Sequence, residues 1–332
     1  MYYIKFSVIY WIEWLLLFFI IMKNINILLA ATTGKYLKYA AVTIESIFCH
    51  QNVLYHYNVY IFVLWDISNY ERIKFEKYNT KNFSVTFIKI DEKNFSKYNS
   101  IKKKQYPYCT RLLLDQYLPW VDRILYLDSD VIVNWDITEL YNSDLSKNIV
   151  WACKDFTNRS YFKKKHLSNY FNSWVLVVDV WRWYKEKIWK EALHLLNNSY
   201  KEFTFPDQDA LNYVLDWKWK SINPKWNWIN IGSFSAKGTQ YSKTEFKSLK
   251  KCEISHYAWS LNRPRSFICV HPKRFLYYKY LFKTKYRHIS DIFNFIFHII
   301  TSNFFIRFMY KVIRFLYFNI FNWKIYLTKK YV

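Results

Sequence analysis

Short apolar segments alternate with helical segments through most of the chain, and this alternation constrains the fold more than any other feature. β-Branched and aromatic residues mark five expected strands at 25–31, 58–64, 84–90, 123–127 and 174–178. Spacing, charge and Pro positions mark intervening helices at 37–49, 69–79, 108–118, 180–196 and from Pro206 onward. We therefore expect an α/β layered fold with a mostly parallel central sheet.

Composition narrows the functional classes. The 332 residues include 49 Lys and Arg against 25 Asp and Glu, giving a formal net charge of +24, and only three Gly. Apolar residues make up 52% of the chain, which excludes a disordered protein, and the scarcity of Gly excludes a Gly-rich phosphate loop. The charge indicates either an anionic partner or a biased genome composition. Five widely spaced Cys without a CxxC pair predict buried free thiols rather than disulfides or a cysteine metal site.

The two ends of the chain differ from its middle. Residues 6–22 are apolar apart from Glu13, so segment 1–21 is expected to be a membrane anchor, an extension upstream of a start at Met22, or a cleaved signal. Residues 22–280 would form the main domain. From residue 281 onward, nine Lys and Arg accompany one acid and many aromatics.

Helical spacing places Arg307, Lys311 and Arg314 on one face, with aromatic and aliphatic residues over the rest of the helix. We expect 281–332 to be a basic aromatic tail lying on an anionic membrane surface. A terminal helix packed on the domain with a solvated basic face is the alternative.

The sharpest chemical signal follows the strand at 123–127. Asp128 and Asp130 lie two residues apart at its end, so both carboxylates can reach one divalent cation, although many turns also carry this pattern. Because ligands bind at strand ends in open α/β sheets, the pair suggests a metal bridging the diphosphate of a departing nucleotide.

Two weaker signals follow. Asp207-Gln208-Asp209 starts a helix, where capping is the simpler explanation. His256 suits either a structural role or a third metal ligand, and Arg263 suits a phosphate.

Together, five motifs in this order and spacing resemble the family-8 retaining glycosyltransferases, which include bacterial lipopolysaccharide galactosyl- and glucosyltransferases and the glycogenins. The resemblance covers about residues 22–264 and rests on Ala30-Ala31, Leu125-Tyr-Leu-Asp-Ser-Asp130, Phe171-Asn172-Ser173, Asp207-Gln208-Asp209-Ala-Leu-Asn212 and His256-Tyr257…Arg263-Pro264. It implies a GT-A type fold that binds nucleotide-diphospho-sugars. It also implies transfer of a hexose from a UDP-sugar to a hydroxyl group with retained anomeric configuration and Mn²⁺ or Mg²⁺.

The resemblance also assigns roles to individual residues. Asp128, Asp130 and His256 match the metal ligands. Residues that match the nucleotide-sugar site are Ala30, Ala31, Thr32, Tyr36, Arg111, Asp128, Ser129, Asn172, Ser173 and Arg263. Asp207 and Gln208 match the catalytic pair beside the reacting face of the sugar. We expect front-side attack by the acceptor, with Asp207 orienting sugar hydroxyls, because the amide of Gln208 is a poor nucleophile; assistance by Gln208 from the opposite face stays open.

Several positions depart from the family pattern. Thr32-Thr33 stand where acids are common, Trp174 and Trp259 stand where Gly is usual, and Arg265 stands where Trp is usual. A Gly-to-Trp change matters where the backbone must approach a phosphate.

We expect a galactosyl- or glucosyltransferase acting on a lipopolysaccharide, lipid-linked or other glycan acceptor at the inner face of the cytoplasmic membrane. A catalytically inactive membrane scaffold is one alternative. A nucleic-acid-binding protein is the other, and we expect no nucleic-acid partner because RNP, KH and zinc-finger patterns are missing from the sequence.

Overall fold

The structure is a computed structural model, and it describes residues 23–31, 34–156, 161, 163, 166–199, 202–230, 240–258, 262–264, 266, 269, 271–301, 308, 312 and 315. The chain divides into two compact units, Met1–His256 and Tyr257–Val332. The expected domains 1–21, 22–280 and 281–332 stay a prediction.

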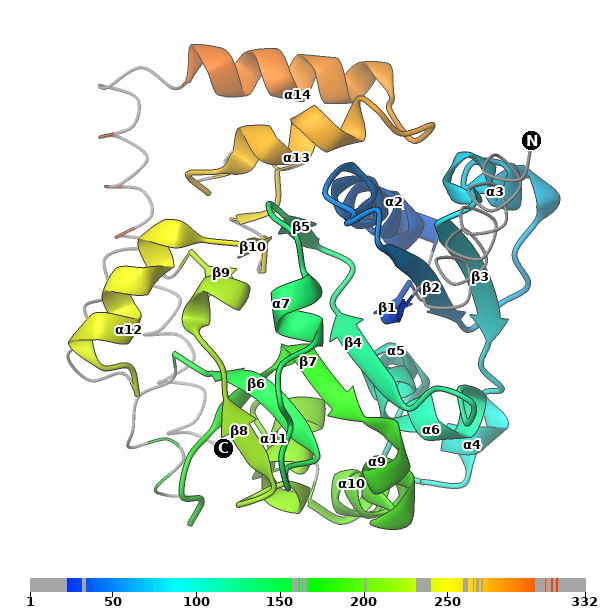
Figure 1. Ribbon diagram of the computed structural model, residues 1–332, viewed down its shortest axis with the longest axis vertical. Coiled ribbons are helices and arrows are strands. Elements are labelled where there is room, and N and C mark those ends of the chain that lie inside the picture. Colours follow the sequence, from blue (N-terminus) through cyan, green and yellow to red (C-terminus); the bar gives the residue numbers. More distant parts are fainter. Residues whose placement is uncertain are drawn as a thin grey trace, which may run out of the picture. The chain divides into compact units, whose positions relative to one another are not determined.

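A seven-stranded sheet forms the centre of the first unit, in the order β3-β2-β1-β4-β7-β6-β8 (Figure 1). Strands β3, β2, β1 and β4 are parallel, β7 is antiparallel to both of its neighbours, and β6 and β8 are parallel to each other. The seven strands are β1 Lys23–Ala30, β2 Tyr55–Val63, β3 Phe83–Lys89, β4 Arg123–Leu127, β6 Val150–Lys154, β7 Phe171–Asp179 and β8 Trp219–Ser221. The α/β class with a mostly parallel sheet is thereby confirmed.

A second, three-stranded sheet lies beside the end of β4. It consists of β5 Val131–Val133, β10 Ile254–His256 and β9 Trp228–Ile229, in the order β5-β10-β9. Strand β10 runs antiparallel to β5, with His256 opposite Val131. This pairing joins segments more than a hundred residues apart in the sequence.

Helices pack against the central sheet because their apolar faces must be buried. Leu28 of β1, Leu176 of β7, Trp183 and Leu211 belong to one buried cluster. Within the described residues of the first unit, the helices are α2 Gly34–Cys49, α3 Asn69–Ile73, α4 Lys93–Ser96, α5 Tyr106–Cys109, α6 Leu114–Tyr117, α7 Thr138–Tyr141, α9 Val180–Lys185, α10 Ile188–Ser199, α11 Pro206–Val214 and α12 Lys243–Ser248. Short 3-10 helices occupy Glu76–Tyr78, Lys103–Gln105, Thr110–Leu113, Pro224–Trp226 and Leu249–Lys251.

All five expected strands are present, whereas three expected helices are interrupted. The expected helix 180–196 is broken between α9 and α10, where Lys187 adopts a left-handed conformation with φ of 54°. Helix 69–79 ends at Ile73 and resumes as a 3-10 turn, and 108–118 consists of successive short α and 3-10 turns. These are corrections to the sequence-based prediction, because composition does not encode such local breaks.

The second unit contains two described helices, α13 Arg274–Leu281 and α14 Ile289–Ile300, which pack against each other (Figure 1). The rings of Tyr278 and Phe282 both lie within 5.5 Å of the Phe295 ring, and Tyr278 Oη donates a 2.6 Å hydrogen bond to the carbonyl of Pro264. None of the helices in the described ranges combines the length and hydropathy that crossing a bilayer requires. The apolar segment 6–22 and the predicted face of Arg307, Lys311 and Arg314 lie outside the described residues.

Candidate functional site

The Asp-x-Asp motif occupies the turn between β4 and β5. Strand β4 is a buried apolar run that ends at Leu127, and the backbone N–H of Asp128 donates to the Trp174 carbonyl at 2.9 Å. The hydroxyl of Thr43 on α2 donates to the carbonyl of Ser129 at 2.8 Å. Packing and hydrogen bonds therefore fix the turn at the carboxyl edge of the sheet, where ligands bind in this fold class.

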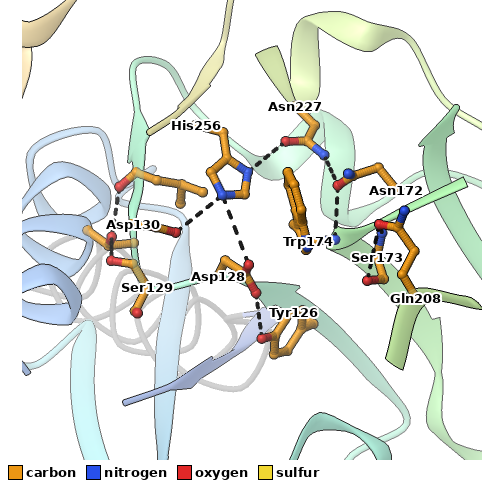
Figure 2. Close-up of polar contacts among 12 residues, drawn as sticks. Tyr126, Asp128, Ser129, Asp130, Asn172, Ser173, Trp174, Gln208, Asn227 and His256 are labelled. Carbon is orange, nitrogen blue, oxygen red and sulfur yellow. Dashed lines mark hydrogen bonds and ion pairs between the residues drawn. The ribbon is translucent and has the colours of Figure 1, made fainter. Parts of the chain in front are cut away.

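His256 meets both carboxylates of this turn (Figure 2). Its Nε2 lies 3.2 Å from Asp130 Oδ1 and 4.0 Å from Asp128 Oδ2. One ligand atom from each of the three residues lies within 4.8 Å of the others. The structure thus brings the three predicted metal ligands together, through the pairing of β10 with β5.

A chain of hydrogen bonds fixes the tautomer of His256. The backbone N–H of Trp174 donates to Asn172 Oδ1 at 3.1 Å, which identifies that atom as oxygen. Asn227 Nδ2 donates to the same oxygen at 2.7 Å, so Asn227 Oδ1 faces His256 Nδ1 at 3.1 Å. Nδ1 therefore carries the proton, and in the neutral imidazole the lone pair of Nε2 faces the carboxylates.

This donor set fits a divalent cation. A nitrogen lone pair beside two carboxylates repels them unless a positive charge lies between the groups. Carboxylate oxygens with one imidazole suit Mn²⁺ and Mg²⁺ sites, and three protein ligands leave coordination positions for phosphate oxygens. Asn227 orients the imidazole from behind, as partners of metal-bound His residues commonly do.

Arg111 links the Asp-x-Asp turn to α11. Its Nη2 lies 3.2 Å from Asp128 Oδ1 and 3.5 Å from Asp207 Oδ2, and its Nη1 donates to the Ser173 carbonyl at 2.6 Å. The guanidinium carbon lies 4.5 Å from the centre of the Tyr126 ring, whose hydroxyl donates to Asp128 at 2.7 Å. One buried cation therefore contacts two of the predicted site carboxylates.

Burial dominates the electrostatics of these carboxylates. Burial raises the pKa of Asp128, although Arg111 and His256 oppose the rise and Asp130 adds to it. Burial likewise raises the pKa of Asp207, and Arg111 is the main opposing influence. A site that contains a desolvated carboxylate of this kind favours an added positive charge.

Asp155, which is not among the site residues predicted from the sequence, connects two of those residues. Its Oδ2 accepts from Asn172 Nδ2 at 2.9 Å and from Gln208 Nε2 at 3.2 Å. Gln208 Oε1 in turn accepts the backbone N–H of Ser173 at 3.0 Å. All four residues are buried. A local sequence pattern cannot reveal Asp155, because its partners lie on β7 and α11, which are distant from it in the sequence.

The third residue of Asp207-Gln208-Asp209 has a structural role. Asp209 is fully buried and accepts backbone N–H groups of Thr204 and Phe205 at 2.8 and 3.1 Å, together with the Tyr170 hydroxyl at 2.6 Å. This agrees with the capping interpretation for Asp209. Asp207 instead faces Arg111.

The other predicted site residues lie in different environments. Ala30 ends β1, and Ala31 follows it at the same carboxyl edge as Asp128. Tyr36 is half-buried in the first turn of α2. Arg263 belongs to the second unit, where it is half-buried, and Thr32 lies outside the described residues.

Trp174 contributes an aromatic wall to the site. The centres of its ring and of the His256 ring are 4.8 Å apart, with an edge-on angle of 65° between their planes. Figure 2 shows the indole between His256 and the Asn172–Ser173 segment. Its volume lies beside the candidate metal ligands. Trp259, the second unusual Trp, lies outside the described residues.

This architecture occurs in solved glycosyltransferases. A structure described as galactosyltransferase LgtC in complex with donor and acceptor sugar analogs superimposes with a TM-score of 0.69, at 19% identity, covering 81% of this chain and all of that one. GlyE of Streptococcus pneumoniae gives a TM-score of 0.61 at 20% identity, covering 78% of this chain and 60% of that one. These likenesses define the class, a GT-A type glycosyltransferase fold.

The sequence itself identifies the family. The profile of glycosyl transferase family 8 matches residues 26–261, so the chain belongs to that family and is a glycosyltransferase. A putative glycosyltransferase of Haemophilus influenzae is 29% identical over 156 residues, covering 45% of this chain and 47% of that protein. Lipopolysaccharide 1,2-glucosyltransferase of Escherichia coli is 33% identical over 101 residues, covering 29% of this chain and 30% of that protein. The chain thus spans half or less of the length of these relatives.

Proposed function

We propose that this glycosyltransferase moves galactose or glucose from a UDP-sugar to a hydroxyl group of a lipopolysaccharide, lipid-linked or other glycan acceptor, with retention and with Mn²⁺ or Mg²⁺. The observation that carries the proposal is the meeting of Asp128, Asp130 and His256 at the carboxyl edge of the sheet. The relative described as a lipopolysaccharide 1,2-glucosyltransferase and the solved galactosyltransferase support the choice of hexose and acceptor class.

The departing UDP sets the main catalytic demand. A divalent cation, when bound by Asp128, Asp130 and His256, would neutralise the diphosphate. Arg111 holds Asp128 and Asp207 in place through ion pairs at 3.2 and 3.5 Å. Because the side chain of Arg111 is buried and tied to the Ser173 carbonyl, this arrangement is set before substrate arrives.

The hydrogen bonds of Gln208 support front-side attack. Its carbonyl oxygen already accepts the Ser173 N–H, and its amide nitrogen donates to Asp155. An amide held at both ends suits positioning better than attack on the anomeric carbon. In this mechanism the acceptor hydroxyl approaches from the face that UDP leaves, and Asp207 orients the hydroxyls of the donor sugar.

The remaining nucleotide contacts follow from the strand ends. We propose that Ala30, Ala31 and Thr32 hold the uridine, with Tyr36 stacking on the base, and that Asn172 and Ser173 contact the donor sugar. Ser129 would contact the nucleotide, and Arg263 would bind a phosphate. The common carboxyl edge of β1 and β4 supports the first part of this assignment.

We also propose that the protein is cytoplasmic and peripheral on the inner face of the cytoplasmic membrane. The chain from residue 257 to 332 holds fourteen Lys and Arg and a single acid, Asp291, which supports attraction to anionic lipid. An N-terminal anchor in 1–21 would add a second attachment.

The decisive experiment measures turnover of UDP-galactose and UDP-glucose with Mn²⁺ in the wild type and in Asp130→Asn. The variant removes one anionic ligand at nearly constant volume, so we expect turnover to fall at least about 100-fold. Asp66→Asn is the matched control, because Asp66 lies on the surface in a pair with Lys89. Equal turnover in all three proteins would contradict the metal role of Asp130.

A further inference from the structure

Helix α14 presents its apolar side outward. Its buried residues are the polar Asp291, Asn294 and His298, spaced three and four positions apart on one face. The opposite face, termed the outward apolar face, has six residues that are each 45–65% exposed: Ile289, Ile292, Phe293, Ile296, Ile299 and Ile300. Because an ordinary surface helix shows the reverse pattern, this face calls for an apolar partner.

The polar side of α14 is committed to the fold of the second unit. Asp291 Oδ2 accepts the backbone N–H of His288 at 2.7 Å and completes a capping box. His298 Nε2 hydrogen-bonds the Pro264 carbonyl at 3.0 Å, and Arg274 Nη2 donates to the His298 carbonyl at 3.5 Å. These bonds fix the rotation of the helix about its axis, so the apolar face does not turn inward.

Exposed cations lie in the segment that immediately precedes α14 in the chain. Lys279, Lys283, Lys285 and Arg287 are exposed in the ten residues that precede α14. The one acid of this unit, Asp291, is buried. An apolar helix face next to a purely basic segment matches the chemistry of an anionic bilayer, whose acyl chains take the apolar side chains and whose headgroups take the cations.

We propose that the outward apolar face of α14 docks this enzyme on anionic lipid, with the helix lying in the plane of the bilayer surface. The proposal rests on the membrane location proposed above and assigns the contact to specific residues. A helix of 12 residues is about 18 Å long, which suits the interfacial layer and is too short to span the hydrocarbon core.

Charge argues against a second copy of the chain as the occupant. A two-fold pair of α14 helices would bring the Lys283, Lys285 and Arg287 segments of both copies toward one interface. Acids that would offset these cations are missing from residues 257–290. Anionic headgroups supply the opposite charge, whereas a second copy repeats the same charge.

The test is sedimentation of the full chain with phosphatidylcholine vesicles, with and without phosphatidylglycerol. Ile292→Gln, Phe293→Gln and Ile296→Gln combined in one variant remove the centre of the apolar face while keeping a residue type that favours helix. We expect wild-type protein to bind the anionic vesicles and the triple variant to bind at least about 100-fold more weakly. Lys283→Glu with Lys285→Glu should weaken binding and reduce its dependence on salt.

The matched control replaces exposed Trp residues of the first unit, Trp135→Gln with Trp181→Gln, which should leave vesicle binding unchanged. Unaltered binding by the triple variant would overturn the assignment to α14. If the wild type forms a dimer and binds no vesicles, and the triple variant is monomeric, the occupant of this face is a second copy of the chain. That outcome would also overturn the assignment to lipid. Turnover of UDP-sugar without vesicles is measured in parallel, so a failure of the proposed reaction is seen separately from a failure of docking.

Discussion

Asn227 lies behind His256, and its replacement by Ala tests whether the hydrogen-bond chain orients the imidazole for metal binding. Asn227 is 3% exposed, accepts from His256 Nδ1 at 3.1 Å and donates to Asn172 Oδ1 at 2.7 Å. Asn227→Ala deletes both bonds and leaves the buried Nδ1–H of His256 without this acceptor. The oxygen of Asn172 keeps the Trp174 N–H as a donor, so the damage falls mainly on His256.

The expected magnitudes follow from these two bonds. Each buried hydrogen bond contributes about 1 kcal/mol, so the free energy of unfolding should fall by about 2 kcal/mol. Loss of a partner behind a metal-bound His typically costs about 10- to 100-fold in metal affinity. Because Asp128 and Asp130 remain, we expect Mn²⁺ binding to weaken within that range without being abolished.

The assay titrates Mn²⁺ into each protein and follows free Mn²⁺ by electron paramagnetic resonance, with urea unfolding as the check on stability. Asn134→Ala is the matched control, since Asn134 Nδ2 donates to Ser255 Oγ at 2.9 Å in the same small sheet but does not contact the metal ligands. Wild-type Mn²⁺ affinity in folded Asn227→Ala would refute the claim that Asn227 orients His256.

Three further outcomes are expected. Burial raises the pKa of Asp115 from 3.8 to about 6, so the stability that its neutral form contributes is complete below about pH 4 and is lost as pH rises through 6. In urea unfolding at pH 7, the free energy of unfolding of Asp115→Asn should exceed that of the wild type by about 2 kcal/mol. A difference between the two proteins that does not shrink toward pH 4 would contradict this. Asp209→Asn should lower the free energy of unfolding by about 3 kcal/mol, because buried donors lose a charged acceptor; an unchanged melting temperature would argue otherwise. Trp174→Ala should raise turnover of N-acetylated UDP-hexoses relative to UDP-hexoses by about 10-fold, and an unaltered ratio would remove Trp174 from the specificity determinants.

The sequence was sufficient to predict the layered fold and the edge of the sheet where the site lies. Strands β1 and β4 both end in apolar runs, 27–30 and 124–127. Because the carboxyl ends of parallel strands meet at one edge of a sheet, Ala31 and Asp128 are expected at the same edge. The helix break at Lys187 could not be predicted, because residues 180–196 contain neither Gly nor Pro to mark it.

The hydrogen bonds that support the site were beyond sequence reasoning for a different reason. Strands β5 and β10 have three residues each, which is too short for an alternating pattern to be recognised. Asn227 and Asp155 contact His256 and Gln208 only after distant segments are brought together. A single Asn or Asp in a loop does not form a sequence motif, so its role in the site cannot be predicted. The motif residues are recognisable because several of them lie close together along the chain.

The geometry at Trp174 changes what its departure from the family pattern means. A Trp in place of a usual Gly would be costly if the position required a left-handed backbone. Trp174 instead lies in the extended strand β7 and is not among the described residues with positive φ. Its carbonyl still accepts the N–H of Asp128 at 2.9 Å, so the Asp-x-Asp turn keeps its anchor. We therefore expect the substitution to act through the volume of the indole beside His256, and to affect which donor fits rather than whether the site forms.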